Sequence, residues 1–226
     1  MRVLLIRHGQ TPHNVSGALD TAFPGAGLTA LGAAQALAVP GALLDEDIAG
    51  IYASRLVRTQ LTAAPLADAR RLEVRVRDGL EEVSAGELEL RSDDEARHAY
   101  AGCVAGWMCG DLDRGMPGGP TGRDFFLRFD AALRAIAKDH DSDDTIAVFS
   151  HGAAIRAYVA LAADLDPQAA TGLTIMNTGS GLLVGHPDSG WNLARWSSDP
   201  LGGPELRDLR ADDITGESAQ EATGEQ

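Results

Sequence analysis

Two histidines in this sequence each follow a short apolar run and precede a glycine, which is an arrangement suited to chemistry. His8 comes after residues 3–6 with Arg7 beside it, and His151 comes after residues 145–149. In an open parallel sheet, ligands bind outside the carboxyl ends of the strands, so we expect both imidazoles to face one pocket. The glycine after each histidine lets the backbone turn sharply and lets a ligand approach closely. Either histidine alone is as readily a packing residue, whereas the pair beside an arginine indicates a functional site.

Strand-like and helical patterns alternate along the chain. Helical patterns separate several apolar runs that are typical of strands, at residues 3–6, 48–53, 72–76, 145–149 and 181–185. This alternation predicts the α/β class, as a three-layer α/β/α sandwich with a mostly parallel central sheet. The carboxyl edge of such a sheet would hold both histidines.

Polar residues mark where several helices are expected to begin. Thr29, Ser54 and Thr121 are predicted N-caps, and Thr121 also opens a capping box. The helix after Ser54 would carry Arg58 near its N-terminus, where free backbone N–H groups also favour an anion. Pro65 is expected to end or kink that helix, because an interior proline costs about 3 kcal/mol.

Composition limits the class of protein. The chain has 226 residues, enough for one sizeable domain, which we place at residues 1–196. Residues 197–226 are rich in Asp, Glu, Gly and Ser, so we expect an acidic tail that packs little. A net charge of −14 argues against a nucleic-acid partner, whose phosphates require a basic surface.

Other features of the sequence bear on its location. The first residues lack the apolar length of a signal peptide, and no run approaches a membrane span, so we expect a cytoplasmic protein with no membrane partner. The two cysteines, Cys103 and Cys109, match no common zinc spacing and are expected to stay reduced.

Five short motifs occur in a fixed order along the chain. The first is Arg7-His8-Gly9-Gln10-Thr11, followed by Asn14, and the last is Ser150-His151-Gly152. Between them lie LTALGAAQA at residues 28–36, SRLVRTQLTA at 54–63 and LEEVSAGELE at 80–89. The ordered series resembles the histidine phosphatase superfamily, also called phosphoglycerate mutase-like. An Arg-His-Gly triplet alone is a weak signal, but five ordered matches are a specific one.

The resemblance implies a fold of the phosphoglycerate mutase-like type and a nucleophilic mechanism. His8 would attack phosphorus and form a phosphohistidine that water then hydrolyses. Glu82, rather than the adjacent Glu81, matches the family's general acid, which protonates the leaving oxygen and then activates water.

The resemblance also implies a phosphate pocket without a metal or other cofactor. Arg7, Arg58 and His151 would bind the phosphoryl oxygens. These three side chains supply the positive charge that Mg²⁺ supplies in other phosphoryl-transfer enzymes. Further residues expected to line the phosphate are Thr11, Asn14 and Gly152.

The chain departs from the family pattern in two places. Leu90 stands where many relatives have glycine, and Gly118-Gly119-Pro120-Thr121 replaces a Gly-Gly-Glu-Ser motif, with Thr121 as a substitute cap. The family commonly uses the region of residues 90–119 as a variable lid, so we expect it to shape substrate choice. Four histidines match no family role and are expected to be ordinary: His13, His98, His140 and His186.

Three functions stay open from the sequence. The leading one is a phosphomonoesterase for small phosphorylated metabolites, with a small phosphate ester as its partner. The second is a cofactor-dependent mutase of the phosphoglycerate mutase type, although the longer insert that such mutases generally carry is not found here. The third is a non-catalytic module that binds phosphorylated ligands or a partner protein. A homodimer is also possible, because dimers are common among relatives.

Overall fold

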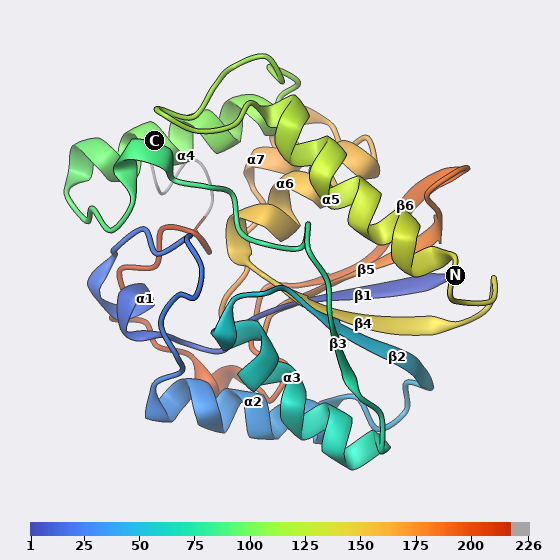
Figure 1. Cartoon of the computed structure of the whole chain (residues 1–226). Helices are drawn as coiled ribbons and strands as arrows, with labels where there is room; N and C mark the ends of the chain where they lie inside the picture. The colour runs from blue at the N-terminus through green and yellow to red at the C-terminus, as the bar shows by residue number, and fades with distance from the viewer. Residues whose placement is uncertain (218–226) are drawn as a thin grey trace.

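A computed structural model describes residues 1–217 and shows one six-stranded sheet between two layers of helices (Figure 1). The strand order is β3-β2-β4-β1-β5-β6. Pairing is parallel from β3 to β1 and antiparallel from β1 to β6. The strands are β1 (Arg2–Arg7), β2 (Ile48–Ala53), β3 (Val74–Val76), β4 (Thr145–Ser150), β5 (Ser180–His186) and β6 (Gly190–Ser197).

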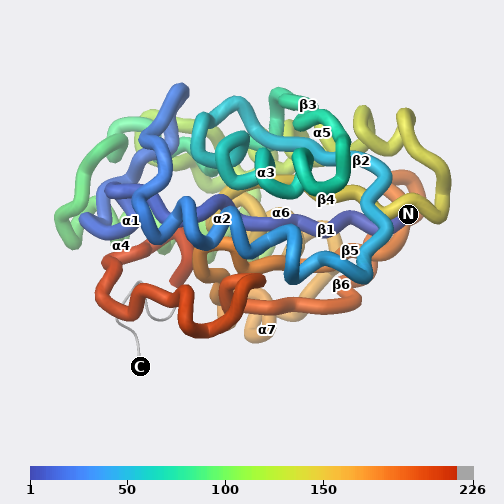
Figure 2. Tube along the Cα trace, turned by 90° about the horizontal axis from the view of Figure 1, so that it is seen from below, coloured from blue at the N-terminus to red at the C-terminus, as the bar shows by residue number. Residues whose placement is uncertain are grey.

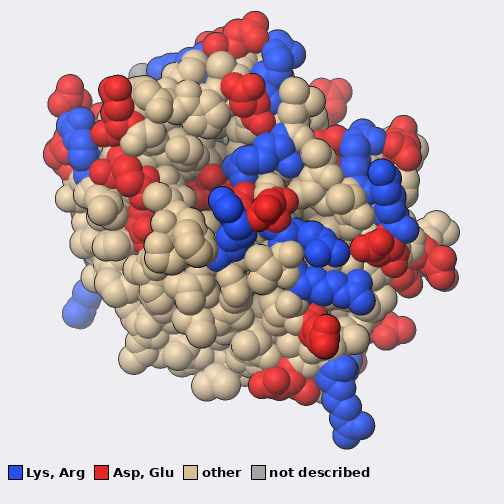
Figure 3. Space-filling model, in the orientation of Figure 1, with Lys and Arg blue, Asp and Glu red and all other residues tan. Residues whose placement is uncertain are grey.

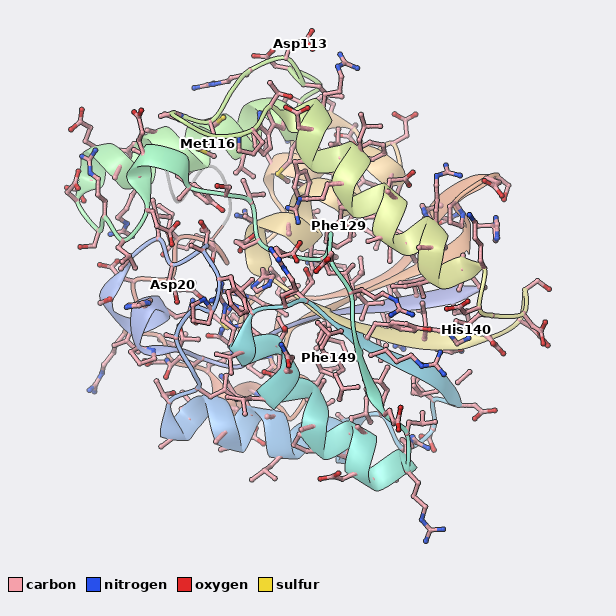
Figure 4. The ribbon with its side chains drawn as sticks, viewed as in Figure 1. Asp20, Asp113, Met116, Phe129, His140 and Phe149 are labelled. Carbon is pink, nitrogen blue, oxygen red and sulfur yellow. The ribbon has the colours of Figure 1, made fainter. Side chains whose placement is uncertain are left out.

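Helices cover both faces of the sheet because both faces of its central strands are apolar. On one face, Leu4 and Phe149 pack with α2 (Ala30–Ala42) and α3 (Val57–Arg70). On the other face, Leu5 packs with Phe129 and the helices α4 (Asp94–Met108), α5 (Gly122–Ala137) and α6 (Gly152–Ala162). Phe149 and Phe129 are labelled in Figure 4 on opposite sides of the sheet. The predicted α/β class with a mostly parallel sheet is confirmed.

Two predicted helix boundaries differ from those in the structure. Pro65 lies inside α3 and does not end it, because the packing of neighbouring residues such as Leu66 against the sheet overrides the local cost of proline. Ser54 is not the N-cap of α3, which begins after Leu56 without a side-chain cap. Thr29 and Thr121 are N-caps as expected, and Thr121 forms its capping box with Asp124.

The end of the described chain packs more than its composition suggested. After β6 and the short 3₁₀ turn η2 (Pro204–Leu206), the chain runs past α2 toward α1 (Pro12–Ser16), as Figure 2 shows. Gln35 of α2 donates to the carbonyl of Leu206, and Ile214 is only 3% exposed. Within residues 197–217, the described part of the predicted tail, Ile214 joins the apolar core. Residues 218–226 lie outside the described part.

The remaining elements are short. They are η1 (Gly86–Leu88) in the loop before α4, and α7 (Pro167–Thr171) after α6. Cys103 and Cys109 are both free. Among residues 1–217, no helix is both long and apolar enough to cross a membrane.

Candidate active site

The two histidines singled out in the sequence lie side by side at the carboxyl ends of β1 and β4. These strands pair in parallel, with Arg7 opposite Ser150, so the residues that follow them emerge together. The imidazole centroids of His8 and His151 are 5.2 Å apart, with the rings inclined at 61°. The backbone N–H of His8 also donates to the carbonyl of Ser150 over 3.0 Å.

The contacts of His8 leave one ring nitrogen available for attack. Its Nδ1 lies 2.8 Å from the carbonyl oxygen of Gly9. Since a carbonyl only accepts, Nδ1 carries the proton and the lone pair of a neutral ring is on Nε2. Burial lowers the pKa of His8 well below its ordinary value, and the nearby Arg58 and Arg7 lower it further. The ring is therefore neutral at pH 7, and the chemistry of Nε2 is that of a base or nucleophile.

His151 is held by a serine that the sequence had suggested for another role. Its Nε2 lies 2.7 Å from Ser54 Oγ, while its buried Nδ1 has no partner within residues 1–217. Burial is the main cause that lowers the pKa of His151, and Arg58 and His8 add to it. Ser54 directly follows β2, the strand beside β4, so the rule that located the histidines also applies to it.

The two arginines are buried, and the Nε of each has no hydrogen-bond partner in the described chain. Arg7 is 0% exposed, and its Nη1 donates to the carbonyl of Ile175 over 2.7 Å. Arg58, at the second position of α3, donates from Nη2 to the carbonyl of Asp20 over 2.8 Å. Asp20 is labelled in Figure 4, on the loop that follows α1. Within the described chain, the Nε groups of both arginines are buried without a partner.

Glu82 is buried and held by backbone donors. Its Oε1 accepts from Ala154 N over 2.7 Å and from Val83 N over 2.9 Å, and its Oε2 accepts from Ala153 N over 3.2 Å. Two of these donors belong to the first turn of α6, where free N–H groups favour an anion. Burial nevertheless outweighs the hydrogen bonds and raises the pKa of Glu82. A raised pKa makes the carboxyl a better proton donor near neutral pH.

Glu81 points the other way and has a structural task. Its carboxylate binds Arg55 and Arg128, each over 2.9 Å. Arg128 of α5 also donates to the carbonyls of Gly79, Glu81 and Glu82, so it fixes the loop that carries both acids. The structure thus separates the two adjacent carboxylates, with Glu82 inside and Glu81 on the outer side.

The sequence matches known proteins over most of its length. The family model for the histidine phosphatase superfamily, branch 1, matches residues 3–199. The chain belongs to the histidine phosphatase superfamily. A probable phosphoglycerate mutase of Enterobacter sp. strain 638 is 30% identical over 206 residues, which are 89% of this chain and 93% of that protein.

Other relatives of this superfamily member come from mycobacteria. A PE-PGRS family protein of Mycobacterium tuberculosis is 36% identical over 216 residues, which are 89% of this chain but 37% of that protein. An uncharacterised protein of the same organism is 52% identical over 66 residues, which are 29% of this chain and 32% of that protein. The matches thus span only about a third of the length of these two relatives.

Two solved phosphatase structures share the fold. Mycobacterial glucosyl-3-phosphoglycerate phosphatase, in complex with VO₃, is 25% identical, with a TM-score of 0.75 over 88% of this chain and 99% of that one. Phosphoserine phosphatase from Entamoeba histolytica, in complex with 3-phosphoglyceric acid, is 25% identical, with a TM-score of 0.71 over 89% and 99%. These two phosphatases and the probable phosphoglycerate mutase support phosphatase activity in general.

The pocket of this superfamily member is narrow and is built from distant parts of the chain. Figure 3 shows Lys and Arg side chains gathered near the middle of one face, although the net charge of the chain is −14. Thr11 caps α1 and bonds with Asn14, and both lie in the pocket wall. The lining residues are His8, Thr11, His13, Asn14, Gly17, Ala18, Asp20, Arg58, Glu82 and Asp212–Thr215.

Three predicted site residues are absent from the lining of this pocket. Arg7 and His151 are completely buried behind the pocket wall. Gly152 begins α6, and a side chain there would overlap the carbonyl of Thr215 and crowd Arg7 Nε. His13, which was expected to be ordinary, lines the pocket and lies 2.9 Å from Asp20.

The expected lid does not form the wall of the pocket. Within residues 1–217, the lining includes no residue of 90–119, although Arg97 of α4 binds the lining residue Asp212 over 3.0 Å. Residues 212–215 take the lid's place. Leu90, which replaces the family's glycine, has φ of 59° and so keeps the left-handed backbone that glycine would favour.

Sequence reasoning missed several polar residues around the arginines. Asp20 holds Arg58, and Asp213 with Thr215 holds Arg7. Nothing local in an acidic loop or tail distinguishes such residues. Among residues 1–217, no group of three or more His, Cys, Asp and Glu side chains is arranged to hold a metal ion.

Proposed function

We propose that this chain is a phosphomonoesterase that hydrolyses small phosphate esters through a phosphohistidine on His8. One observation carries the proposal. Five buried nitrogens have no hydrogen-bond partner within the described chain, and three of them, Arg7 Nε, Arg58 Nε and His151 Nδ1, belong to residues around His8. Buried polar groups are normally satisfied, so unsatisfied ones require an explanation. An anion bound beside the nucleophile supplies it.

The reaction follows from the contacts of each residue. Nε2 of His8 attacks phosphorus while the bond to the leaving oxygen breaks, and Arg7 and Arg58 hold the non-bridging oxygens. When His151 Nε2 accepts from Ser54 Oγ, the proton of the neutral ring is on Nδ1, which donates to the same oxygens as charge develops. Glu82 gives its proton to the leaving oxygen. The resulting carboxylate then accepts a proton from water, which attacks the phosphohistidine and releases phosphate.

The second candidate is a mutase, which the likeness to a probable phosphoglycerate mutase favours. A mutase uses the same phosphohistidine but returns the phosphoryl group to an acceptor before water reaches it. A non-catalytic phospho-ligand module is the third candidate, and the available nucleophile and acid speak against it. A cytoplasmic location and a homodimer also stay predictions.

A panel of phosphate esters separates the three candidates. The panel contains 3-phosphoglycerate, phosphoserine, a glucosyl-3-phosphoglycerate and p-nitrophenyl phosphate, each assayed with and without 2,3-bisphosphoglycerate. We expect release of inorganic phosphate that does not depend on the bisphosphate. Phosphoryl exchange between positions that requires the bisphosphate would instead identify a mutase, and binding without turnover would identify the non-catalytic module.

Turnover is expected to be independent of divalent metal, because Arg7, Arg58 and His151 provide the charge at the phosphoryl site. Activity measured after dialysis against EDTA should match that of untreated protein, and vanadate or excess inorganic phosphate should inhibit it. As the control, Mg²⁺ or Zn²⁺ is added back to the dialysed protein and its activity is measured again. Activity that disappears on chelation and returns with either ion contradicts this mechanism.

A further inference from the structure

The segment at residues 208–217 brings a carboxylate to the buried arginine of the site. Asp213 Oδ1 accepts from Arg7 Nη2 over 2.6 Å and from Asn14 Nδ2 over 3.0 Å. Thr215 Oγ1 accepts from the same Arg7 nitrogen over 2.8 Å and lies 3.2 Å from Asp213 Oδ1. One carboxylate oxygen therefore joins two residues that the family pattern assigns to the phosphate.

This segment is built to fit its place. Its ends are held by Gln10, which donates to Asp208 over 2.8 Å, and by the backbone N–H of Ile175, which donates to the carbonyl of Gly216 over 2.8 Å. A side chain at position 216 would overlap Arg7 Nη1, so the close approach requires glycine there. Between these anchors the buried Ile214 fixes the register of Asp213 against the site.

The contacts of Asp213 leave the Nε of Arg7 without a partner in the described chain. Arg7 uses Nη1 for Ile175 and Nη2 for Asp213 and Thr215, while its Nε stays unpartnered in the described chain. Within residues 1–217, Asp213 makes no hydrogen bond to His8, Arg58 or His151. The carboxylate thus holds one end of the guanidinium and leaves the other available.

We propose that Asp213 is a positioning residue of the active site, which holds Arg7 and Asn14 in the orientation that binds the phosphoryl oxygens. This inference rests on the proposed function. A buried guanidinium without a counter-charge is strongly disfavoured and would move or draw in water. The carboxylate of Asp213, on the C-terminal segment, balances the charge of Arg7. The guanidinium is therefore oriented before the substrate arrives.

A different role is conceivable for the same contacts. Asp213 would be an internal competitor if its carboxylate occupied the place of a phosphoryl oxygen and had to leave before substrate bound. The free Nε groups and the free His151 Nδ1 favour positioning, since a competitor would satisfy those donors. When the carboxylate is removed, the positioning role predicts slower turnover and weaker binding of phosphate. The competitor role predicts faster turnover and tighter binding.

The test compares Asp213→Ala, which removes the acceptor, with Asp213→Asn, which keeps an oxygen that accepts from Arg7 Nη2. Misplacement of a substrate-binding group by about 1 Å costs on the order of 10²-fold in rate. We expect Asp213→Ala to lose about 10- to 100-fold in kcat/KM for p-nitrophenyl phosphate, with weaker inhibition by inorganic phosphate. Asp213→Asn should recover part of that loss, because it restores the acceptor for Arg7 Nη2 but not the counter-charge.

The matched control is Asp199→Asn. Asp199 lies in the same C-terminal stretch and pairs with Arg207 at the surface. Its replacement by asparagine therefore removes an equal charge without touching Arg7. We expect it to have wild-type kcat and KM.

Several outcomes would overturn the inference. If Asp213→Ala has wild-type kinetics, Asp213 has no positioning role. If Asp213→Ala turns over faster and binds inorganic phosphate more tightly, Asp213 is an internal competitor. If Asp213→Ala does not fold, Asp213→Asn decides, since a competitor again predicts faster turnover and tighter phosphate binding. If the wild-type protein hydrolyses no ester, the proposed function fails separately. Calorimetry with inorganic phosphate then tests Asp213 alone, and equal affinity in wild type and Asp213→Ala refutes positioning.

Discussion

The His8→Ala protein is expected to lose turnover by a factor of about 10⁴ or more, because no other group replaces the attacking Nε2. The hydrogen bond from Nδ1 to the Gly9 carbonyl directs the lone pair to Nε2, and the lowered pKa keeps the ring neutral. Rapid quenching of the wild-type protein with a labelled ester should trap a phosphoenzyme that is labile in acid and stable in base. The variant should form none.

A matched control distinguishes loss of the nucleophile from loss of structure. His98 is exposed on α4, and His98→Ala should keep wild-type turnover and the same phosphoenzyme. Circular dichroism of the His8→Ala protein should also match the wild type. Substantial activity in His8→Ala, or a phosphoenzyme whose lability is that of an acyl phosphate, would show that another residue is attacked.

The sequence located the histidines because strand ends are readable from local patterns. Buried parallel strands are continuous apolar runs, and the run before His8 and the run before His151 are both of this kind. The general rule that ligands bind beyond the carboxyl ends of parallel strands then predicts that both histidines face one pocket. The family motif added Arg58 and Glu82, which have no such local signal.

The sequence did not show how distant segments close the pocket. Asp213 is separated from Arg7 by most of the chain, and its acidic surroundings resemble those of a solvated tail. The burial of Ile214 and the anchors at Asp208 and Gly216, which depend on the assembled fold, place this segment against the site. The strand β6 was missed for a similar reason, because its alternating pattern includes polar residues and gains its hydrogen bonds from β5.

Local sequence preferences gave wrong helix boundaries where tertiary contacts determine the structure. Ser54 has the side chain of a good N-cap, but its Oγ lies between His151 Nε2 and Thr59 Oγ1. Pro65 should interrupt a helix, yet α3 continues through it. In both cases the packing around the site outweighs a local preference of about 1 to 3 kcal/mol.

Glu82→Gln is expected to slow hydrolysis of an alkyl phosphate by about 10²- to 10⁴-fold, because a poor leaving group needs a proton as its bond breaks. p-Nitrophenolate leaves readily without one, so p-nitrophenyl phosphate should lose much less. Glutamine can keep the Oε1 contacts with Ala154 and Val83, and it loses only the longer bond to Ala153. Comparison of kcat for the two esters therefore measures proton donation and not collapse of the loop.

The pH dependence provides an independent reading of the same residue. Because burial raises the pKa of Glu82, its acid form persists above the usual range of a carboxyl group. Turnover of the alkyl phosphate should fall as pH rises through that raised pKa, since the donor is then deprotonated. Glu82→Gln should lack this limb of the profile.

Glu81→Gln is the matched control for Glu82→Gln. Glu81 binds Arg55 and Arg128 on the outer side of the loop, so its replacement weakens the support of the loop without removing a proton donor. We expect turnover close to wild type, and any loss should be the same for both esters and leave the pH limb in place. If Glu81→Gln instead slows the alkyl phosphate far more than p-nitrophenyl phosphate, the acid is Glu81. The inward position of Glu82 would then not be the position in which the reaction occurs.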